Sequence, residues 1–182
     1  MILPVYLYNH PILRNKAEAI QNFDQELRDF AENMFETMRN AIGIGLAANQ
    51  VGSNKAMTVI DISELEEGVG TKPMVLINPV IEAYSDDENE YEEGCLSVPD
   101  IRDMVTRPAA IQVRFNDENM REITMEAEGL LARVMQHEID HLNGVYFFER
   151  MSPMRRTLNK NKLKKIERGQ FEPEYPHIQG KQ

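Results

Sequence analysis

The chain has 182 residues, a length that suits one well-filled domain better than two. Its 42% hydrophobic content is ordinary for a globular protein, and no apolar run approaches the roughly 18 residues needed to cross a membrane. The net charge of −10 argues against a protein that wraps nucleic acid over its whole surface. The first eight residues contain no charged leader and no small-residue cleavage site, so we expect a cytoplasmic protein without a signal peptide.

The first half of the chain predicts one helix followed by strands. Leu27, Phe30, Met34 and Met38 recur at three- and four-residue spacing, which predicts a helix over residues 24–40 with one apolar stripe. Shorter alternating segments predict strands at residues 57–62, 74–79, 110–115 and 121–125.

The second half predicts two further helices. One is expected from about Glu126 to Asn143, where Gly144 supplies a left-handed cap, and another begins after Ser152-Pro153. This order predicts an α+β fold in which antiparallel sheets pack around the central helix, with a C-terminal helix outside. We expect residues 1–169 to form one catalytic domain and residues 170–182 to form a loose tail.

Charge is unevenly distributed along the sequence. Residues 150–170 contain eight Lys or Arg and one acid, a net +7, so the rest of the chain carries −17. Such a basic segment can bind a phosphate-rich partner or simply balance an acidic body, and the sequence leaves both open. The acidic run at residues 86–90 is expected to be a solvated loop.

His137 and His141 are the strongest chemical signal in the chain. They lie four residues apart on the predicted central helix, so both rings project from one face and can bind one metal ion. Glu138 follows His137, where its carboxylate can reach a water molecule without being a ligand itself. Two core histidines without a metal are the alternative, but this pattern on an inward helix face favours a metal site.

A catalytic site of this kind needs a third protein ligand. The sequence from His137 to Gly144 follows the metzincin protease pattern, but Phe147 stands where that pattern requires a third histidine. Cys95, the only cysteine, has no disulfide partner within the chain and is the natural candidate, because a thiolate and two imidazoles suit zinc or ferrous iron. Two alternatives are another small zinc protease and a metal-stabilised RNA- or ribosome-binding module, although the module needs a fourth ligand and none is evident.

The chain resembles the peptide deformylases in three segments that occur in order. They are Gly43-Ile44-Gly45-Leu46-Ala47-Ala48-Asn49-Gln50, Glu93-Gly94-Cys95-Leu96-Ser97 and Gln136-His137-Glu138-Ile139-Asp140-His141. Residues 11–14 and 144–147 also resemble the family, so the resemblance covers nearly the whole chain except about the last dozen residues.

The resemblance implies hydrolysis of the formyl group on the N-terminal formyl-methionine of newly made proteins, with release of formate. One divalent metal ion, natively Fe2+ with Zn2+, Ni2+ or Co2+ as replacements, would activate water and be held by Cys95, His137 and His141. Glu138 would act as general base and then general acid. The Gln50 side-chain amide and the Leu96 N–H would stabilise the oxyanion.

Residues expected to bind the substrate fall into three groups. Gly43 and Gly45 would let an extended peptide lie close to the main chain. Glu93 belongs to the second family segment. A methionine pocket would be walled by Ile44, Leu130 and Val134, each of which also suits the core.

The resemblance also implies partners. Formyl-Met nascent peptides would be the substrate, no membrane is involved, and the basic C-terminal helix is a candidate contact to the ribosome surface. Asp140 is expected to pair with an arginine such as Arg107 and so brace the metal-binding helix.

Overall fold

The computed structural model describes residues 1–180 and has a mixed helix and strand order. Its helices are α1 (Gln25–Asn40), α2 (Gly129–Leu142) and α3 (Pro153–Glu167), with 3-10 turns η1 (Pro11–Arg14), η2 (Ala48–Val51), η3 (Glu66–Gly68) and η4 (Phe147–Arg150). Its strands are β1 (Val5–Tyr6), β2 (Gly45–Ala47), β3 (Met57–Ile60), β4 (Met74–Tyr84), β5 (Glu88–Cys95), β6 (Val98–Pro108), β7 (Ala110–Asn116), β8 (Glu122–Glu128) and β9 (His177–Ile178).

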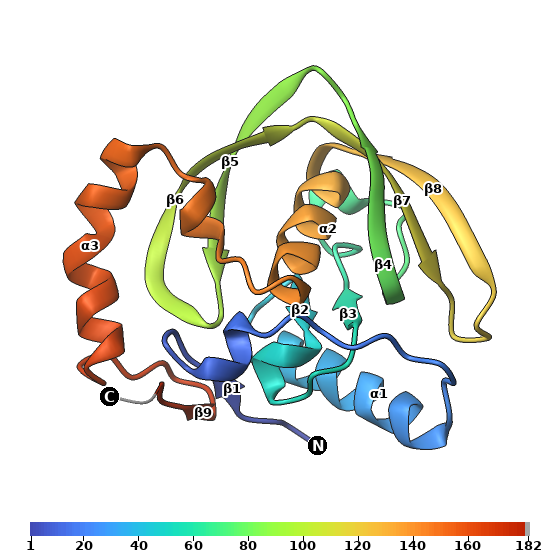
Figure 1. Cartoon of the computed structure of the whole chain (residues 1–182), viewed down its shortest axis with the longest axis horizontal. Helices are drawn as coiled ribbons and strands as arrows, with labels where there is room; N and C mark the ends of the chain where they lie inside the picture. The colour runs from blue at the N-terminus through green and yellow to red at the C-terminus, as the bar shows by residue number, and fades with distance from the viewer. Residues whose placement is uncertain (181–182) are drawn as a thin grey trace.

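Helix α2 is the centre of the molecule. Figure 1 shows it between the β5–β6 hairpin on one side and strands β4, β7 and β8 on the other, with α3 beyond the hairpin. Every residue from Ala132 to Leu142 is buried, because the helix has neighbours on several faces. The predicted α+β fold with antiparallel sheets around this helix is confirmed.

The main sheet is antiparallel and has the strand order β2-β3-β4-β7-β8. Alternate residues of β7 (Ile111, Val113 and Phe115) point into the core, as the period of two predicts. Strand β2 is at one edge of this sheet, pairing only with β3 among the described strands. The edge strand therefore offers a place where an extended chain can approach.

The β5–β6 hairpin was not predicted. Its first strand begins inside the acidic run, so the prediction of a solvated loop at residues 86–90 is wrong from Glu88 onward, although Glu88 and Glu90 are exposed. Polar residues occupy both faces of this segment, so it carries no hydrophobic alternation. The predicted start of the central helix near Glu126 is also wrong, because β8 continues to Glu128 and Gly129 (φ 58°) turns the chain into α2.

Helix α3 is attached to β6 through Asp103. The carboxylate of Asp103 accepts hydrogen bonds from Arg155 and from Asn159 Nδ2 (2.7 Å). Burial raises the pKa of Asp103, but hydrogen bonds from the Met104 N–H, Asn159 and Arg155 outweigh it and hold this pKa below its ordinary value. The ionised carboxylate therefore favours docking of the helix.

The C-terminal segment differs from the expected loose tail. Strand β9 pairs in parallel with β1, and the N–H groups of Val5 and Leu7 donate to the carbonyls of Pro176 and Ile178, both at 2.9 Å. A two-residue strand has no periodicity from which the sequence could predict it. Residues 181–182 of the expected tail lie outside the described residues. Across residues 1–180, no helix combines the length and apolar character needed to cross a membrane.

Candidate metal centre and active site

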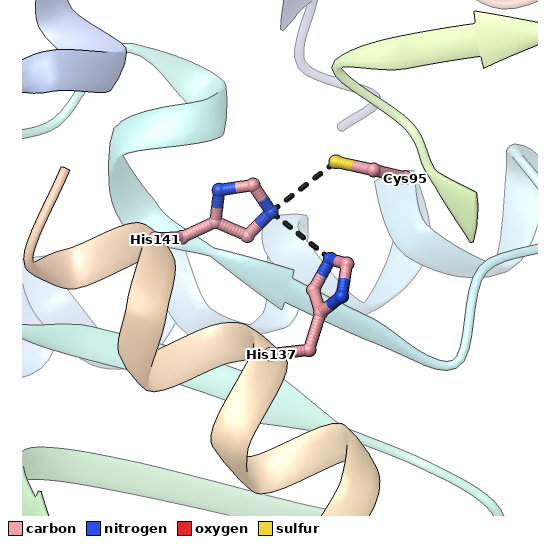
Figure 2. A group of neighbouring side chains, drawn as sticks. All are labelled: Cys95, His137 and His141. Atoms are coloured by element: carbon pink, nitrogen blue, oxygen red, sulfur yellow. Dashed lines mark hydrogen bonds between the residues drawn. The ribbon is translucent and has the colours of Figure 1, made fainter. Parts of the chain in front are cut away.

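Cys95, His137 and His141 converge although they come from separate elements. Cys95 ends β5, and both histidines lie on one face of α2 (Figure 2). His141 Nε2 lies 3.2 Å from Cys95 Sγ and 3.1 Å from His137 Nε2, and the ligand atoms of the three residues all fall within 4.8 Å of one another. The structure thus brings together the three predicted ligands.

The spacing of these donor atoms fits a metal ion. A tetrahedral ion with ordinary Zn–N and Zn–S bonds separates its donors by about 3.3–3.5 Å, close to the two distances above. Next to them, Glu138 Oε2 is buried and has no protein hydrogen-bond partner. An oxygen buried without a partner is expected where water or a reacting group belongs.

Glu93 orients His137 from behind. Its carboxylate accepts a hydrogen bond from His137 Nδ1 (2.8 Å) and further hydrogen bonds from Arg107 Nε and Arg133 Nη1, both at 2.7 Å. Burial opposes ionisation of Glu93, but the contacts of His137 and Arg107 lower its pKa far below the ordinary range. This fixes the histidine ring with Nε2 toward Cys95.

The acidic groups around His137 favour a cation at the site. Burial opposes a charge on His137, yet contacts with Cys95 and Glu93 and the charge of Glu138 raise the pKa of His137 to about 10. By contrast, burial and the neighbouring His137 charge lower the pKa of His141, which keeps that imidazole neutral and able to act as a ligand. The surroundings therefore suit a positively charged ion held by thiolate and imidazole.

A buried ion-pair network holds α2 against the hairpin. The predicted pair is present: Arg107 Nη1 donates to Asp140 Oδ2 at 2.6 Å, and Arg150 Nη2 donates to Asp140 Oδ1 at 2.7 Å. Sequence reasoning did not find the role of Arg133, which is 3% exposed and bonds both Glu93 and the backbone of Asn89. Its only sequence signal is a charged residue on the apolar part of the helix.

Gly45 lies against the carboxylate of Glu138. A Cβ at this position would come within 2.4 Å of Glu138 Oε1. Burial raises the pKa of Glu138 to about 7, with a further rise from Glu93 against opposite contributions from His137 and Arg107. The glycine expected to accommodate a peptide therefore also makes room for this carboxylate.

Gln50 and Leu96 flank the donor atoms. The Gln50 side-chain oxygen accepts a hydrogen bond from the Ala47 N–H (2.8 Å), and its nitrogen lies 3.5 Å from Cys95 Sγ and 3.1 Å from Ser97 Oγ. The amide is thus anchored at one end and lies beside the thiol of the candidate ligand Cys95 at the other. Leu96 directly follows Cys95 in the same loop.

One cleft of about 1210 Å³ connects these groups. Cys95, His137 and Glu138 line it, together with all of the predicted substrate-binding and oxyanion residues: Gly43, Ile44, Gly45, Gln50, Glu93, Leu96, Leu130 and Val134. Phe147, at the position of the absent third histidine, instead stacks on His137 with ring centroids 5.7 Å apart. The site is thus a cleft that contains three candidate ligands.

Comparisons with known proteins agree with this arrangement. The sequence profile of the polypeptide deformylase family matches residues 2–157. The chain belongs to this family. Enzymes of the family remove the formyl group from the N-terminal formyl-methionine of new proteins, and the chain is accordingly a metallohydrolase with that activity.

Individual deformylases are similar over most of their length. The peptide deformylase of Salinibacter ruber is 44% identical over 185 residues, covering 98% of this chain and 95% of its own. The crystal structure of a Legionella pneumophila deformylase is 38% identical with a TM-score of 0.82, covering 93% and 98%. A Synechococcus elongatus deformylase in complex with actinonin is 42% identical with a TM-score of 0.79, covering 88% and 85%.

Proposed function

We propose that deformylation takes place at the cleft end of α2, with one divalent metal ion, natively Fe2+, held by Cys95, His137 and His141. The observation that carries this proposal is the convergence of three donor atoms beside a buried carboxylate oxygen that lacks a protein partner. When bound, the ion would supply an activated water molecule near neutral pH and would polarise the formyl oxygen. Thiolate and imidazole ligands support Fe2+ and equally allow Zn2+, Ni2+ or Co2+ as replacements.

Glu138 moves the proton. Its Oε2 is buried beside the candidate ligands and has no protein hydrogen-bond partner, which suits a group that accepts a proton and then returns it. Oε2 takes the proton of the attacking water and delivers it to the nitrogen of the departing amine. Formate and a free N-terminal amine are the products.

Two donors stabilise the charge that develops on the formyl oxygen. We assign them to the Gln50 side-chain amide and the Leu96 backbone N–H. The position of the amide beside Cys95 Sγ and its anchor at Ala47 support the first assignment. Held donors of this kind lower a barrier because they need no reorganisation during the reaction.

The formyl-methionine peptide binds along β2. This strand lies at the edge of the sheet, and its first residue, Gly45, lines the cleft together with Gly43, which suits pairing with an extended chain. The methionine side chain occupies the apolar wall of Ile44, Leu130 and Val134. Glu93 contributes through its backbone, since both of its carboxylate oxygens already accept hydrogen bonds within the protein.

The basic helix α3 is a docking surface for the ribosome in this proposal. Arg156, Lys160 and Lys164 are exposed on it, in a segment of net charge +7. Ribosomal RNA supplies phosphates to such a surface, and the substrate emerges nearby. A ribosome-linked substrate also supports the expected cytoplasmic location.

Formate release under anaerobic conditions tests the proposal. Iron-loaded wild type should release formate from formyl-Met-Ala, and Glu138→Ala should retain its metal but lose activity by about two to four powers of ten. Formate release that survives the substitution unchanged contradicts the role of Glu138. Loss of the fold on chelation would instead favour the structural metal module considered above.

A further inference from the structure

The C-terminal segment forms a wall of the catalytic cleft. Residues 171–175 line the cleft together with Cys95 and Leu96. Phe171 packs against the apolar cluster that includes Val98 and Ile101, and β9 pairs with β1 immediately beyond the segment. Figure 1 shows this end of the chain returning from α3 to lie beside β1. The wall is therefore fixed at both of its ends.

Tyr175 makes the contact closest to the site. Its hydroxyl donates a hydrogen bond to the backbone carbonyl of Leu96 at 2.6 Å. Burial, with a smaller contribution from Cys95, raises the pKa of Tyr175 above its ordinary value. The phenol consequently remains a proton donor throughout the working pH range.

Residues Leu96 and Ser97, which follow Cys95, are held at three points. Gln50 Nε2 lies 3.1 Å from Ser97 Oγ, and the Tyr8 N–H donates to the Ser97 carbonyl at 2.7 Å. Both of these contacts act on Ser97, whereas Tyr175 acts on Leu96 itself. The Leu96 carbonyl shares a rigid peptide plane with the Ser97 N–H, so the hydrogen bond from Tyr175 restrains that plane. On the other side of Leu96, Cys95 is paired with Val98. The two dihedral angles of Leu96, and hence the direction of its own N–H, are therefore restrained from both sides.

We propose that Tyr175 is a positioning residue for deformylation: through its hydrogen bond, the C-terminal strand sets the backbone of Leu96 as an oxyanion donor. The inference rests on the proposed function, because it assigns a structural cause to one of its donors. Residues 171–175, which follow helix α3, would thereby contribute to the reaction. A donor that is already held in place is worth more in the transition state than one that must first be oriented.

The substitution Tyr175→Phe removes the hydroxyl and keeps the ring. We expect kcat for formyl-Met-Ala to fall about two- to twelvefold, since a neutral hydrogen bond contributes roughly 0.5–1.5 kcal/mol. KM should change less than twofold, because the Leu96 N–H acts on the transition state more than on the bound substrate. Tyr84→Phe is the matched control: Tyr84 is 59% exposed on β4, and its variant should keep wild-type kcat.

Backbone NMR of the zinc-loaded protein gives a readout that is independent of turnover. Tyr175→Phe should shift or broaden the amide signals of Leu96 and Ser97, whereas Tyr84→Phe should leave them unchanged. An active wild type with unchanged kcat and unchanged Leu96 signals in Tyr175→Phe overturns the inference. If wild type releases no formate at all, the proposed function fails instead. The NMR comparison still shows whether Tyr175 fixes the backbone conformation of Leu96 and Ser97.

Discussion

Substituting Gly45 by alanine tests how closely the backbone of β2 defines the position of the general base. The new methyl group would lie 2.4 Å from Glu138 Oε1 and 2.8 Å from its Cδ, whereas ordinary contact begins at 3.4 Å. The carboxylate or the strand must therefore move by about 1 Å, the difference between 3.4 and 2.4 Å. A misplacement of this size costs about a hundredfold in rate, or about 2.7 kcal/mol of activation free energy.

Steady-state kinetics on formyl-Met-Ala measure this effect. Gly45→Ala should lower kcat about a hundredfold while metal content stays at the wild-type level, because Glu138 is not a ligand. Gly43→Ala is the matched control, since its methyl group would meet the flexible end of Leu96, Cδ1, at 3.0 Å and would otherwise make ordinary contacts at 3.4 Å with Met38. We expect that control to lose less than about tenfold.

A double-mutant cycle identifies the cause. If the alanine acts by displacing the carboxylate, Gly45→Ala should have little further effect in a Glu138→Ala background. Equal hundredfold losses in both backgrounds would refute this reasoning and assign the effect to peptide binding at β2. A Gly45→Ala enzyme with wild-type kcat would also refute it.

Three further predictions concern the metal, the pH dependence and the ribosome. Glu93→Gln should weaken metal affinity about 10- to 100-fold in a chelator competition, because His137 loses its charged partner; unchanged affinity would contradict that role. Asp103 has a lowered pKa, so its ionised form stabilises the fold above the ordinary carboxyl pKa, and this contribution is lost as pH falls through the folded value. Asp103→Asn should thus reduce stability by about 1 kcal/mol or less at pH 7, and the difference in Tm from wild type should shrink below about pH 4; a constant difference would argue against it. Replacing Arg156, Lys160 and Lys164 together by glutamine should reduce ribosome cosedimentation at low salt and weaken its salt dependence, whereas unchanged binding would remove α3 as the contact.

The sequence was sufficient to predict which three candidate ligands converge, because their signal is local. Two histidines four residues apart on a helix share one face whatever surrounds them, and the segment that contains Cys95 carries the family pattern. The role of Arg133 could not be predicted in this way. It depends on Glu93, forty residues earlier, and only the packing of α2 against β5 brings the two together.

The fold was predictable where hydrophobic periodicity is strong. Helix α1 and strand β7 show the expected spacing and lie where predicted. Strand β5 of the hairpin was missed because charged residues lie on both of its faces, so neither face carries a continuous apolar signal. Strand β9 was missed because its pairing with β1 joins opposite ends of the chain.

Product analysis tests the central claim most directly. Iron-loaded protein is incubated anaerobically with formyl-Met-Ala-Ser, and the peptide is then examined by mass spectrometry with formate measured in parallel. We expect loss of the formyl group alone, equimolar formate and an intact peptide chain. Cleavage of an internal peptide bond, or an unaltered peptide under these conditions, would contradict it.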